Sequence, residues 1–216
     1  MTTQHDHHAG DGDTEYTQEF WDARYGSADR IWSGRPNTQL VTHAAELPPG
    51  EALDVGSGEG ADAIWLASHG WRVTAVDVSA VALDRAARAA AAVGEQVAAR
   101  IRWEQRDMLT WDPGPARFDL VSAQFMHLPR PAQDMMHARL AAAVRPGGTL
   151  LIVGHLHDEQ HAHIAPRFRP AEDIVADLDP ADWRVIVATA IERPGTSPDG
   201  EPTTLSDSVL RAVRRS

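Results

Sequence analysis

Short apolar runs alternate with segments of helical periodicity along most of the chain. Apolar runs bounded by turn residues predict buried strands, and apolar positions that recur every three or four residues predict helices. We expect strands at residues 52–55, 71–76, 100–106, 118–123 and 149–154. We expect helices at residues 38–47, 61–69, 79–93, 131–144 and 170–178. Strands that alternate with helices are typical of an α/β domain built on a parallel sheet.

The pattern changes near the C-terminus. Asp182–Glu192 and Ser206–Arg214 alternate like two strands, and the loop 194–204 separates them. Such a pair predicts an antiparallel hairpin. Five parallel strands followed by this hairpin give an α/β fold with a seven-stranded mixed sheet and helices on both faces.

The front of the chain differs from the rest in its polar and aromatic content. Residues 1–13 are polar and histidine-rich, which predicts a disordered N-terminal tail. Residues 14–47 carry an aromatic amphipathic helix that begins near Thr14, followed by a glycine-containing aromatic loop. This segment is interpreted either as a helical lid or as a helix packed on the domain. Residues 48–216 hold the main domain, and no internal repeat divides it.

The stretch 51–77 has the sequence EALDVGSGEGADAIWLASHGWRVTAVD, and it reads as strand, glycine turn, helix and strand. Glycines at positions 56, 58 and 60 allow the backbone to turn sharply and to approach a ligand without a Cβ in between. In open α/β sheets, ligands bind outside the carboxyl ends of the strands. Asp77 stands at such an end, so the stretch predicts a ligand-binding turn with an acid beside it.

Two kinds of adenosine-containing ligand fit this turn. Gly56, Gly58 and Ala61 satisfy the relaxed dinucleotide pattern, in which a downstream acid binds the ribose hydroxyls. Asp54, however, places a carboxylate where a pyrophosphate would be repelled and an amino or sulfonium cation attracted. Gly60 also falls one position early for the dinucleotide pattern. A nicotinamide-dependent oxidoreductase therefore stays as the alternative to a protein that binds a cationic adenosine compound.

The chain resembles class I S-adenosylmethionine-dependent methyltransferases in the motifs DVGSGEG (54–60) and VDVS (76–79). The Pro-Gly-Gly turn before the fifth strand also recurs in that class, and the resemblance covers about residues 50–214. Three shorter pieces, WDxRY, WSGxPN and GEGxDAIWLA, are similar to the small-molecule branch of tellurite-resistance and thiopurine methyltransferases. The resemblance implies a Rossmann-like fold, S-adenosyl-L-methionine as cofactor, and methyl transfer to a sulfur, selenium, tellurium, oxygen or nitrogen atom of a small-molecule acceptor.

The resemblance also implies which residues hold the cofactor. The residues assigned to its methionine end are Asp54, Gly56, Ser57 and Gly58. Those assigned to the ribose are Asp77 with its neighbour Val78, and those assigned to the adenine are Asp107 and Met108. Gln124 is assigned to the loop under the sulfonium, and Trp21, Tyr25 and Trp32 are expected to close over cofactor or substrate. From the residues alone, Asp107 also fits an ordinary helix cap or turn, and Glu59 receives no role beyond proximity.

His127 is the candidate catalytic residue. A sulfonium methyl is already an activated electrophile, so methyl transfer depends mainly on holding nucleophile and methyl together and on excluding water. A general base is needed only for an acceptor that arrives protonated, such as a phenol or an ammonium. His127 follows the fourth strand, and histidine titrates near neutral pH. The alternatives are a loop residue without chemistry and a hydrogen bond to the cofactor.

Histidines beyond the fifth strand raise the question of a metal. His155, His157, His161 and His163 lie close together, and alternation on a strand end can align two of them for a transition metal. An exposed loop or a pocket rim is the favoured interpretation. Metal-dependent catechol-type enzymes need hard carboxylate ligands, which these loops do not offer, so no metal is expected in the reaction. The third hypothesis is a non-catalytic protein that binds the cofactor or a metal.

Composition excludes several classes. The 31 acidic and 20 basic residues give a formal charge of −11, which argues against a nucleic-acid partner. No apolar run approaches the roughly 20 residues of a membrane span and no signal-peptide core is found, so a cytoplasmic protein without membrane contact is expected. The absence of cysteine excludes disulfides, thiolate zinc sites and a cysteine nucleophile. Ala-Gln-Phe-Met after the fourth strand replaces the Asn/Asp-Pro-Pro-aromatic motif of amino-group methylases that act on adenine or glutamine. The oligomeric state stays open.

Overall fold

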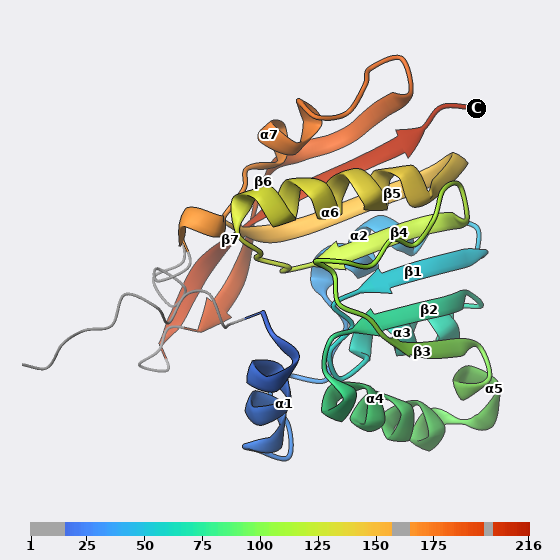
Figure 1. Ribbon diagram of the computed structural model, residues 1–216, viewed down its shortest axis with the longest axis vertical. Coiled ribbons are helices and arrows are strands. Elements are labelled where there is room, and N and C mark those ends of the chain that lie inside the picture. The colour runs from blue at the N-terminus through green and yellow to red at the C-terminus, as the bar shows by residue number, and fades with distance from the viewer. Residues whose placement is uncertain (1–15, 157–164, 197–200) are drawn as a thin grey trace, which may run out of the picture.

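Seven strands form one mixed sheet in the computed structural model, which describes residues 16–156, 165–196 and 201–216 (Figure 1). The strands are β1 (Glu51–Val55), β2 (Arg72–Asp77), β3 (Ile101–Gln105), β4 (Phe118–Gln124), β5 (Val144–Leu156), β6 (Trp183–Thr196) and β7 (Pro202–Arg214). Their order across the sheet is β3-β2-β1-β4-β5-β7-β6. The first five run parallel, and β7 lies antiparallel between β5 and β6. The predicted fold class is confirmed.

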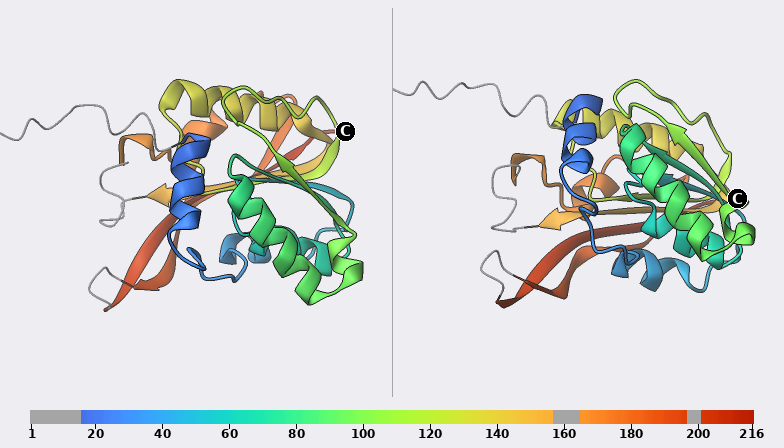
Figure 2. Two further views of the ribbon diagram at one scale, coloured as in Figure 1. Left: turned by 60° about the horizontal axis from the view of Figure 1, so that its bottom comes forward. Right: turned by 90° about the horizontal axis from the view of Figure 1, so that it is seen from below.

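Helices cover both faces of the sheet, as predicted. They are α1 (Gln18–Gly26), α2 (Thr38–Ala44), α3 (Ala61–Ser68), α4 (Ala80–Val93), α5 (Glu95–Ala98), α6 (Arg130–Ala143) and α7 (Ala171–Val175). Leu40 of α2 and Leu66 of α3 belong to the core on one face, and Met136 of α6 and Ile174 of α7 to the core on the other. Figure 2 shows α2 and α6 on opposite sides of the sheet. Within the described residues, no helix has the length and apolar character needed to cross a membrane.

The central strands are apolar on both sides because each side faces a core. Neighbouring strand residues point to opposite faces. In β1, Ala52 lies in the core under α2 and α3, while Leu53 lies in the core under α6 and α7. Leu151 and Leu150 of β5 divide in the same way. Strands that are buried on both faces read as continuous apolar runs, which is why the sequence pattern located them.

The C-terminal hairpin is longer than the sequence predicts. Pro194 pairs with Thr204 and Gly195 with Thr203, so the ladder continues well into the expected loop 194–204. Proline is tolerated there because β6 is the edge strand of the sheet, where one row of backbone groups has no ladder partner. The predicted loop is therefore wrong at both ends, and residues 197–200 lie outside the described residues.

The Pro-Gly-Gly turn also lies inside a strand rather than before it. β5 begins at Val144, and its register against β4 shifts between Phe118 and Leu120 of β4. Residues 145–148 form this irregularity, and Gly147 adopts a φ of 80°. A glycine meets that requirement without steric cost.

The N-terminal segment also begins differently from the expectation. The helix expected from Thr14 starts at Gln18. Thr17 caps this helix, because its side chain accepts a hydrogen bond from the amide of Phe20 at 3.2 Å. The short helix α5 is not predicted by the sequence pattern. The tail expected at residues 1–13 lies outside the described residues.

The strand order reverses between β1 and β4, which lie side by side at the centre of the sheet. In open α/β sheets the crevice at the carboxyl ends of such strands is where ligands bind. In Figure 1, α1 lies toward the carboxyl ends of the parallel strands. The fold therefore places the glycine turn and the N-terminal helix at the same end of the sheet.

Candidate functional site

The glycine turn follows β1 directly. The amides of Gly56 and Ser57 donate to the carbonyl oxygen of Val76 at 2.9 and 3.0 Å, so the turn folds back over the end of β2. Gly56, Gly58 and Gly60 have φ values of 70°, 51° and 84°. Residues with a Cβ rarely adopt such values. The turn thus depends on its glycines, as the sequence indicates.

Three buried carboxylates lie beside the turn. Asp54 of β1, Asp62 of α3 and Asp77 of β2 are 2%, 6% and 8% exposed. Asp77 accepts hydrogen bonds from the amides of Gly58 at 2.8 Å and Ser79 at 2.9 Å. The Oδ2 atom of Asp54 is buried and finds no hydrogen-bond partner among the described residues. A buried carboxylate oxygen without a partner is costly, so it indicates a missing donor or cation.

The pKa values of the clustered carboxyl groups also indicate a site for a positively charged group. Burial raises the pKa of Asp54 well above its usual range, and the charges of Asp62 and Asp77 raise it further. Burial also raises the pKa of Asp77, although hydrogen bonds from Ser79 and Gly58 oppose the shift. A cation beside Asp54 would favour its ionised form. The cluster is therefore suited to a positively charged group.

Two of the predicted aromatic residues lie over the turn. The Nε1 atom of Trp32 donates to the hydroxyl oxygen of Tyr25 at 2.9 Å. A Cβ built on Gly58 would come within 2.9 Å of the same oxygen. Tyr25 is buried, whereas Trp32 is 45% exposed, and the Trp21 ring lies 5.9 Å from the Tyr25 ring. The structure brings these side chains to the turn, and their closing over a cofactor stays a prediction.

Acidic residues that the sequence left without a role fasten this N-terminal segment to the domain. Asp22 of α1 accepts from the hydroxyl of Ser79 at 2.6 Å, at the start of α4. Asp62 accepts from the backbone and side-chain amides of Asn37 at 2.7 and 2.8 Å. These partners are 57 and 25 residues apart in the sequence. No local pattern marks such pairs, which is why the sequence reasoning missed them.

The two residues assigned to the adenine occupy different environments. Asp107 is exposed, and its Oδ1 accepts from the amide of Leu109 at 2.8 Å, as in an ordinary turn. Met108 is buried among core residues that include Leu53 and Val76. The structure thus gives both residues a structural role, and their contact with an adenine ring stays a prediction.

Other predicted residues present polar atoms that find no partner among the described residues. Gln124 donates through Nε2 to the hydroxyl of Ser122 at 2.9 Å, while its Oε1 is buried and unpaired there. The hydroxyl of Ser57 is likewise buried without a partner. Val78 follows Asp77, and its carbonyl oxygen accepts from Gln105 at 3.0 Å. The unpaired atoms belong to residues that the sequence placed at the cofactor.

Four rings gather at the carboxyl ends of β4 and β5, and we call them the ring cluster: Phe125, His127, His155 and Phe168. Phe125 stacks on His155 with centroids 4.4 Å apart, and His127 lies 5.1 Å from both His155 and Phe168. Phe125 has a φ of 57°, which is unusual for a bulky residue. Such strain is often kept at functional sites. His127 is therefore placed at the predicted end of the sheet, among aromatic neighbours.

A buried arginine lies behind the ring cluster. Arg169 contacts His137 at 3.3 Å and Asp134 at 3.0 Å, and it also pairs with Asp177. Burial, together with the charge of Arg169, lowers the pKa of His137 to about 4. Gln133 donates to the carbonyl oxygens of Met126 and Arg167 at 3.2 and 3.3 Å.

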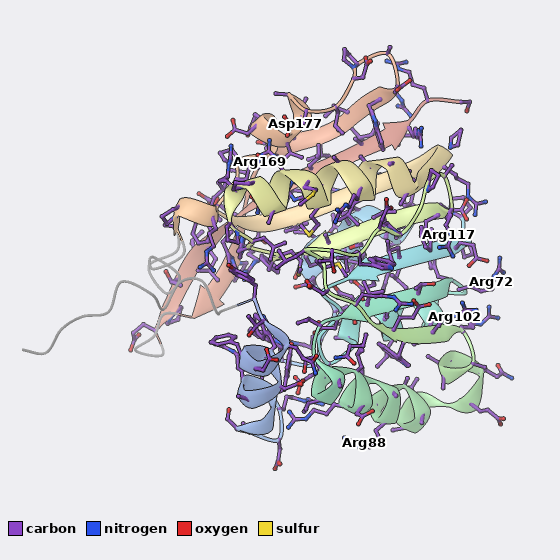
Figure 3. The ribbon with its side chains drawn as sticks, viewed as in Figure 1. Arg72, Arg88, Arg102, Arg117, Arg169 and Asp177 are labelled. Atoms are coloured by element: carbon purple, nitrogen blue, oxygen red, sulfur yellow. The ribbon has the colours of Figure 1, made fainter. Side chains whose placement is uncertain are left out.

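Figure 3 shows Arg169 and Asp177 near α6 and α7. Arg72 and Arg102 lie instead near the amino ends of β2 and β3, and Arg117 directly precedes β4 (Figure 3). The sequence reasoning missed Gln133, His137 and Arg169, because a polar residue buried by distant elements has no local signature.

Among residues 16–156, 165–196 and 201–216, no three His, Asp or Glu side chains converge as metal ligands would. Of the four histidines considered from the sequence, His155 stacks in the ring cluster. His157, His161 and His163 lie outside the described residues.

Comparisons with known proteins agree with this geometry. Residues 52–148 match a family model described as a methyltransferase domain. A probable thiol methyltransferase of Arabidopsis thaliana is 27% identical over 146 residues, which are 65% of this chain and 63% of that protein. The chain spans between a third and two thirds of the length of the curated relatives that it matches.

Solved structures extend the likeness to nearly the whole chain. One, described as "Conversion of a Disulfide Bond into a Thioacetal Group during Echinomycin Biosynthesis", is 25% identical with a TM-score of 0.71 and covers 92% of this chain and 93% of its own. TehB from Haemophilus influenzae has a TM-score of 0.65 at 16% identity, covering 92% of this chain and 67% of its own, and shows the fold alone. The motifs, the sheet order and the matched domain agree, so residues 52–148 form a methyltransferase domain and the chain as a whole is similar to the class I S-adenosylmethionine-dependent methyltransferases.

Proposed function

We propose that the chain is an enzyme that transfers a methyl group from S-adenosyl-L-methionine to a small-molecule acceptor without the help of a metal. The observation that carries the proposal is the Oδ2 atom of Asp54, which is buried in a carboxylate cluster beside a glycine turn and has no hydrogen-bond partner among the described residues. What this oxygen lacks is a cation or a donor. A dinucleotide would instead bring a pyrophosphate of the same sign as the cluster.

The residues around the turn fit the parts of this cofactor. Asp54 would hold the amino group at the methionine end, and Gly56 and Gly58, which have no Cβ, would let that end approach the backbone closely. Asp77 would accept from the ribose hydroxyls with the lone pairs that its two amide bonds leave free. Asp107 and Met108 would meet the adenine. When bound, the cofactor supplies an electrophilic methyl group on a positively charged sulfur, which requires no metal to activate it.

The chain itself would contribute position and shelter. Tyr25 and Trp32 cover the turn from the N-terminal segment 14–47, which we infer to be a lid on the domain 48–216. The ring cluster lies at the carboxyl ends of β4 and β5. Holding acceptor and methyl together and excluding water is the main source of rate in such a displacement.

A sulfur acceptor is the first candidate among sulfur, selenium, tellurium, oxygen and nitrogen nucleophiles. The names of two matched proteins refer to sulfur chemistry. One is a probable thiol methyltransferase, and the other is the protein of the disulfide-to-thioacetal conversion. Sulfur also makes favourable contacts with aromatic rings, and the ring cluster offers four. We therefore expect thiols to be the best substrates in a screen that also contains phenols, amines and selenium or tellurium species.

Titration calorimetry tests the cofactor directly. We expect micromolar or tighter binding of S-adenosylhomocysteine and no heat with NADH, because the turn is lined by carboxylates rather than by donors for a pyrophosphate. Binding of NADH alone would instead favour a nicotinamide-dependent oxidoreductase. Binding of S-adenosylhomocysteine with no methyl transfer to any acceptor of the screen would favour a non-catalytic cofactor-binding protein.

His127→Ala is expected to slow the methylation of protonated acceptors on the order of a hundredfold, the usual range for a lost general base. The affinity for S-adenosylhomocysteine should change little. An acceptor that is already ionised, such as a selenolate, should react with the variant nearly as fast as with the wild type. Turnover assays with a phenol and a selenolate, run on the same preparations, give the comparison. Equal losses for both acceptors would remove His127 as a base.

A further inference from the structure

Glu59 lies inside the glycine turn and points toward the N-terminal segment. Its Oε2 accepts hydrogen bonds from the amides of Ile31 at 3.2 Å and Trp32 at 3.1 Å. Its Oε1 pairs with Arg85 of α4 at 3.1 Å. The side chains of Glu59 and Arg85 are only 12% and 20% exposed. One carboxylate thus joins the turn, the loop after α1 and the helix α4.

The loop that Glu59 holds is the one that covers the turn. Trp32 follows Ile31, and its indole donates to the hydroxyl of Tyr25. That hydroxyl lies against Gly58, the residue before Glu59. The contacts therefore form a closed ring, from Glu59 through the Trp32 backbone and indole to Tyr25 and back to the turn.

The other anchors of the segment act elsewhere. Asp22 holds α1 at the start of α4, and Asp62 holds Asn37 at the start of α2. Asp62 therefore holds the far end of the loop that carries Trp32, and the hydrogen bonds of Asp22 and Asp62 do not involve Ile31 or Trp32. Glu59 fixes this loop from within the turn. Because its hydrogen bonds go to backbone amides, they do not depend on the side chains of the loop.

We propose that Glu59 is a positioning residue that holds Trp32 and Tyr25 over the glycine turn and thereby retains the S-adenosyl ligand bound there. The proposal rests on the proposed function, since it concerns the same ligand. Covering segments act mainly on dissociation, because a ligand leaves only after they open. Glu59 thus contributes to retention of the ligand without being required to touch it.

The test compares Glu59→Ala, Glu59→Gln and the control Glu51→Ala. Glu51 also pairs with an arginine, Arg72, but on an exposed surface away from the turn. Hydrogen–deuterium exchange is followed on the peptide that covers residues 27–37. The dissociation rate and the Kd of S-adenosylhomocysteine are measured on the same proteins.

For Glu59→Ala we expect faster exchange at Ile31 and Trp32 and a Kd raised about tenfold, on the scale of one lost charge-assisted hydrogen bond. The increase should arise in the dissociation rate. Glu59→Gln keeps one acceptor oxygen at the same place and should recover part of both effects, which a general loss of packing would not produce. Glu51→Ala should match the wild type in every measurement.

Three results would overturn the proposal. The first is unchanged exchange over 27–37 in both Glu59 variants, and the second is faster exchange with an unchanged Kd. The third is a weakened Kd with an unchanged dissociation rate. If the wild-type chain itself does not bind S-adenosylhomocysteine, the proposed function fails and the retention claim fails with it. Normal wild-type binding that the Glu59 variants reproduce removes only the role of Glu59.

Discussion

Asp54→Asn is expected to weaken the binding of S-adenosyl-L-methionine on the order of a thousandfold, while the free protein stays at least as stable as the wild type. Removing one partner of a buried ion pair typically costs about 3–5 kcal/mol. In the described part of the free protein no cationic side chain pairs with Asp54, and the charges that act on it are those of Asp62 and Asp77. Asparagine has nearly the same size and removes this repulsion. Calorimetry and thermal unfolding of the two proteins measure both effects.

Asp207→Asn is the matched control for Asp54→Asn. Asp207 is also fully buried, but it pairs with Arg193 at 2.8 Å. Its replacement should leave Arg193 without a buried counter-charge and lower the Tm, with little effect on cofactor affinity. A fall in Tm for Asp54→Asn as large as that for Asp207→Asn, or a retained cofactor affinity, would contradict the role given to Asp54.

The pH dependence of cofactor binding follows from the same carboxyl group. The pKa of Asp54 in the folded protein lies above the ordinary 3.8, so the free protein keeps a proton there that the unfolded chain has lost. The resulting contribution to stability is fully present below the unfolded pKa and is lost as pH rises through the folded pKa. A cationic ligand binds the ionised form, so affinity should rise with pH over the same window.

The wild-type protein should therefore release a proton when it binds the cofactor, and Asp54→Asn should not. Calorimetry in two buffers of different ionisation enthalpy detects the released proton. A binding heat that is the same in both buffers across this window would show that Asp54 does not change its protonation state.

The parts of this structure that the sequence predicts are those with local causes. The turn after β1 needs backbone angles that glycine alone adopts freely, and the central strands are apolar on both faces, so both leave a pattern within a few residues. The hairpin ends are less local, because Pro194 pairs with Thr204 through backbone groups that carry no sequence signal. From residue type alone, Pro194 and Thr204 would both be predicted to lie in a loop.

The residues of the candidate site also divide into those with a local sequence signal and those without one. Asp54 and Asp77 are predictable because they stand at the ends of recognisable strands. The roles of Glu59 and Arg169 could not be predicted, because each residue acquires its partners only when distant elements pack together. The partners of Glu59 are Ile31 and Arg85. Those of Arg169 are His137 and Asp134. Met108, after β3, lies in the core, and its contact with an adenine ring stays a prediction.

Gly60→Ala is expected to lower the free energy of unfolding by about 2–6 kcal/mol, from two causes that add. Gly60 has a φ of 84°, where a Cβ costs about 1–3 kcal/mol. That Cβ would also lie 2.6 Å from the Trp103 ring and 2.7 Å from the Cβ of Ala86. Such overpacking typically costs a further 1–3 kcal/mol. Urea denaturation measures the loss.

Gly26→Ala separates these causes from a general sensitivity to glycine replacement. Gly26 ends α1, its φ is not positive, and no atom of the described residues lies within 4 Å of the Cβ that it would gain. Alanine there should be neutral or stabilise the helix by up to about 1 kcal/mol. Similar losses at Gly60 and Gly26, or a loss below about 1 kcal/mol at Gly60, would contradict the packing of the turn against β3 and α4. Because the turn and the cofactor site share this backbone, Gly60→Ala should also weaken S-adenosylhomocysteine binding at temperatures where the variant remains folded.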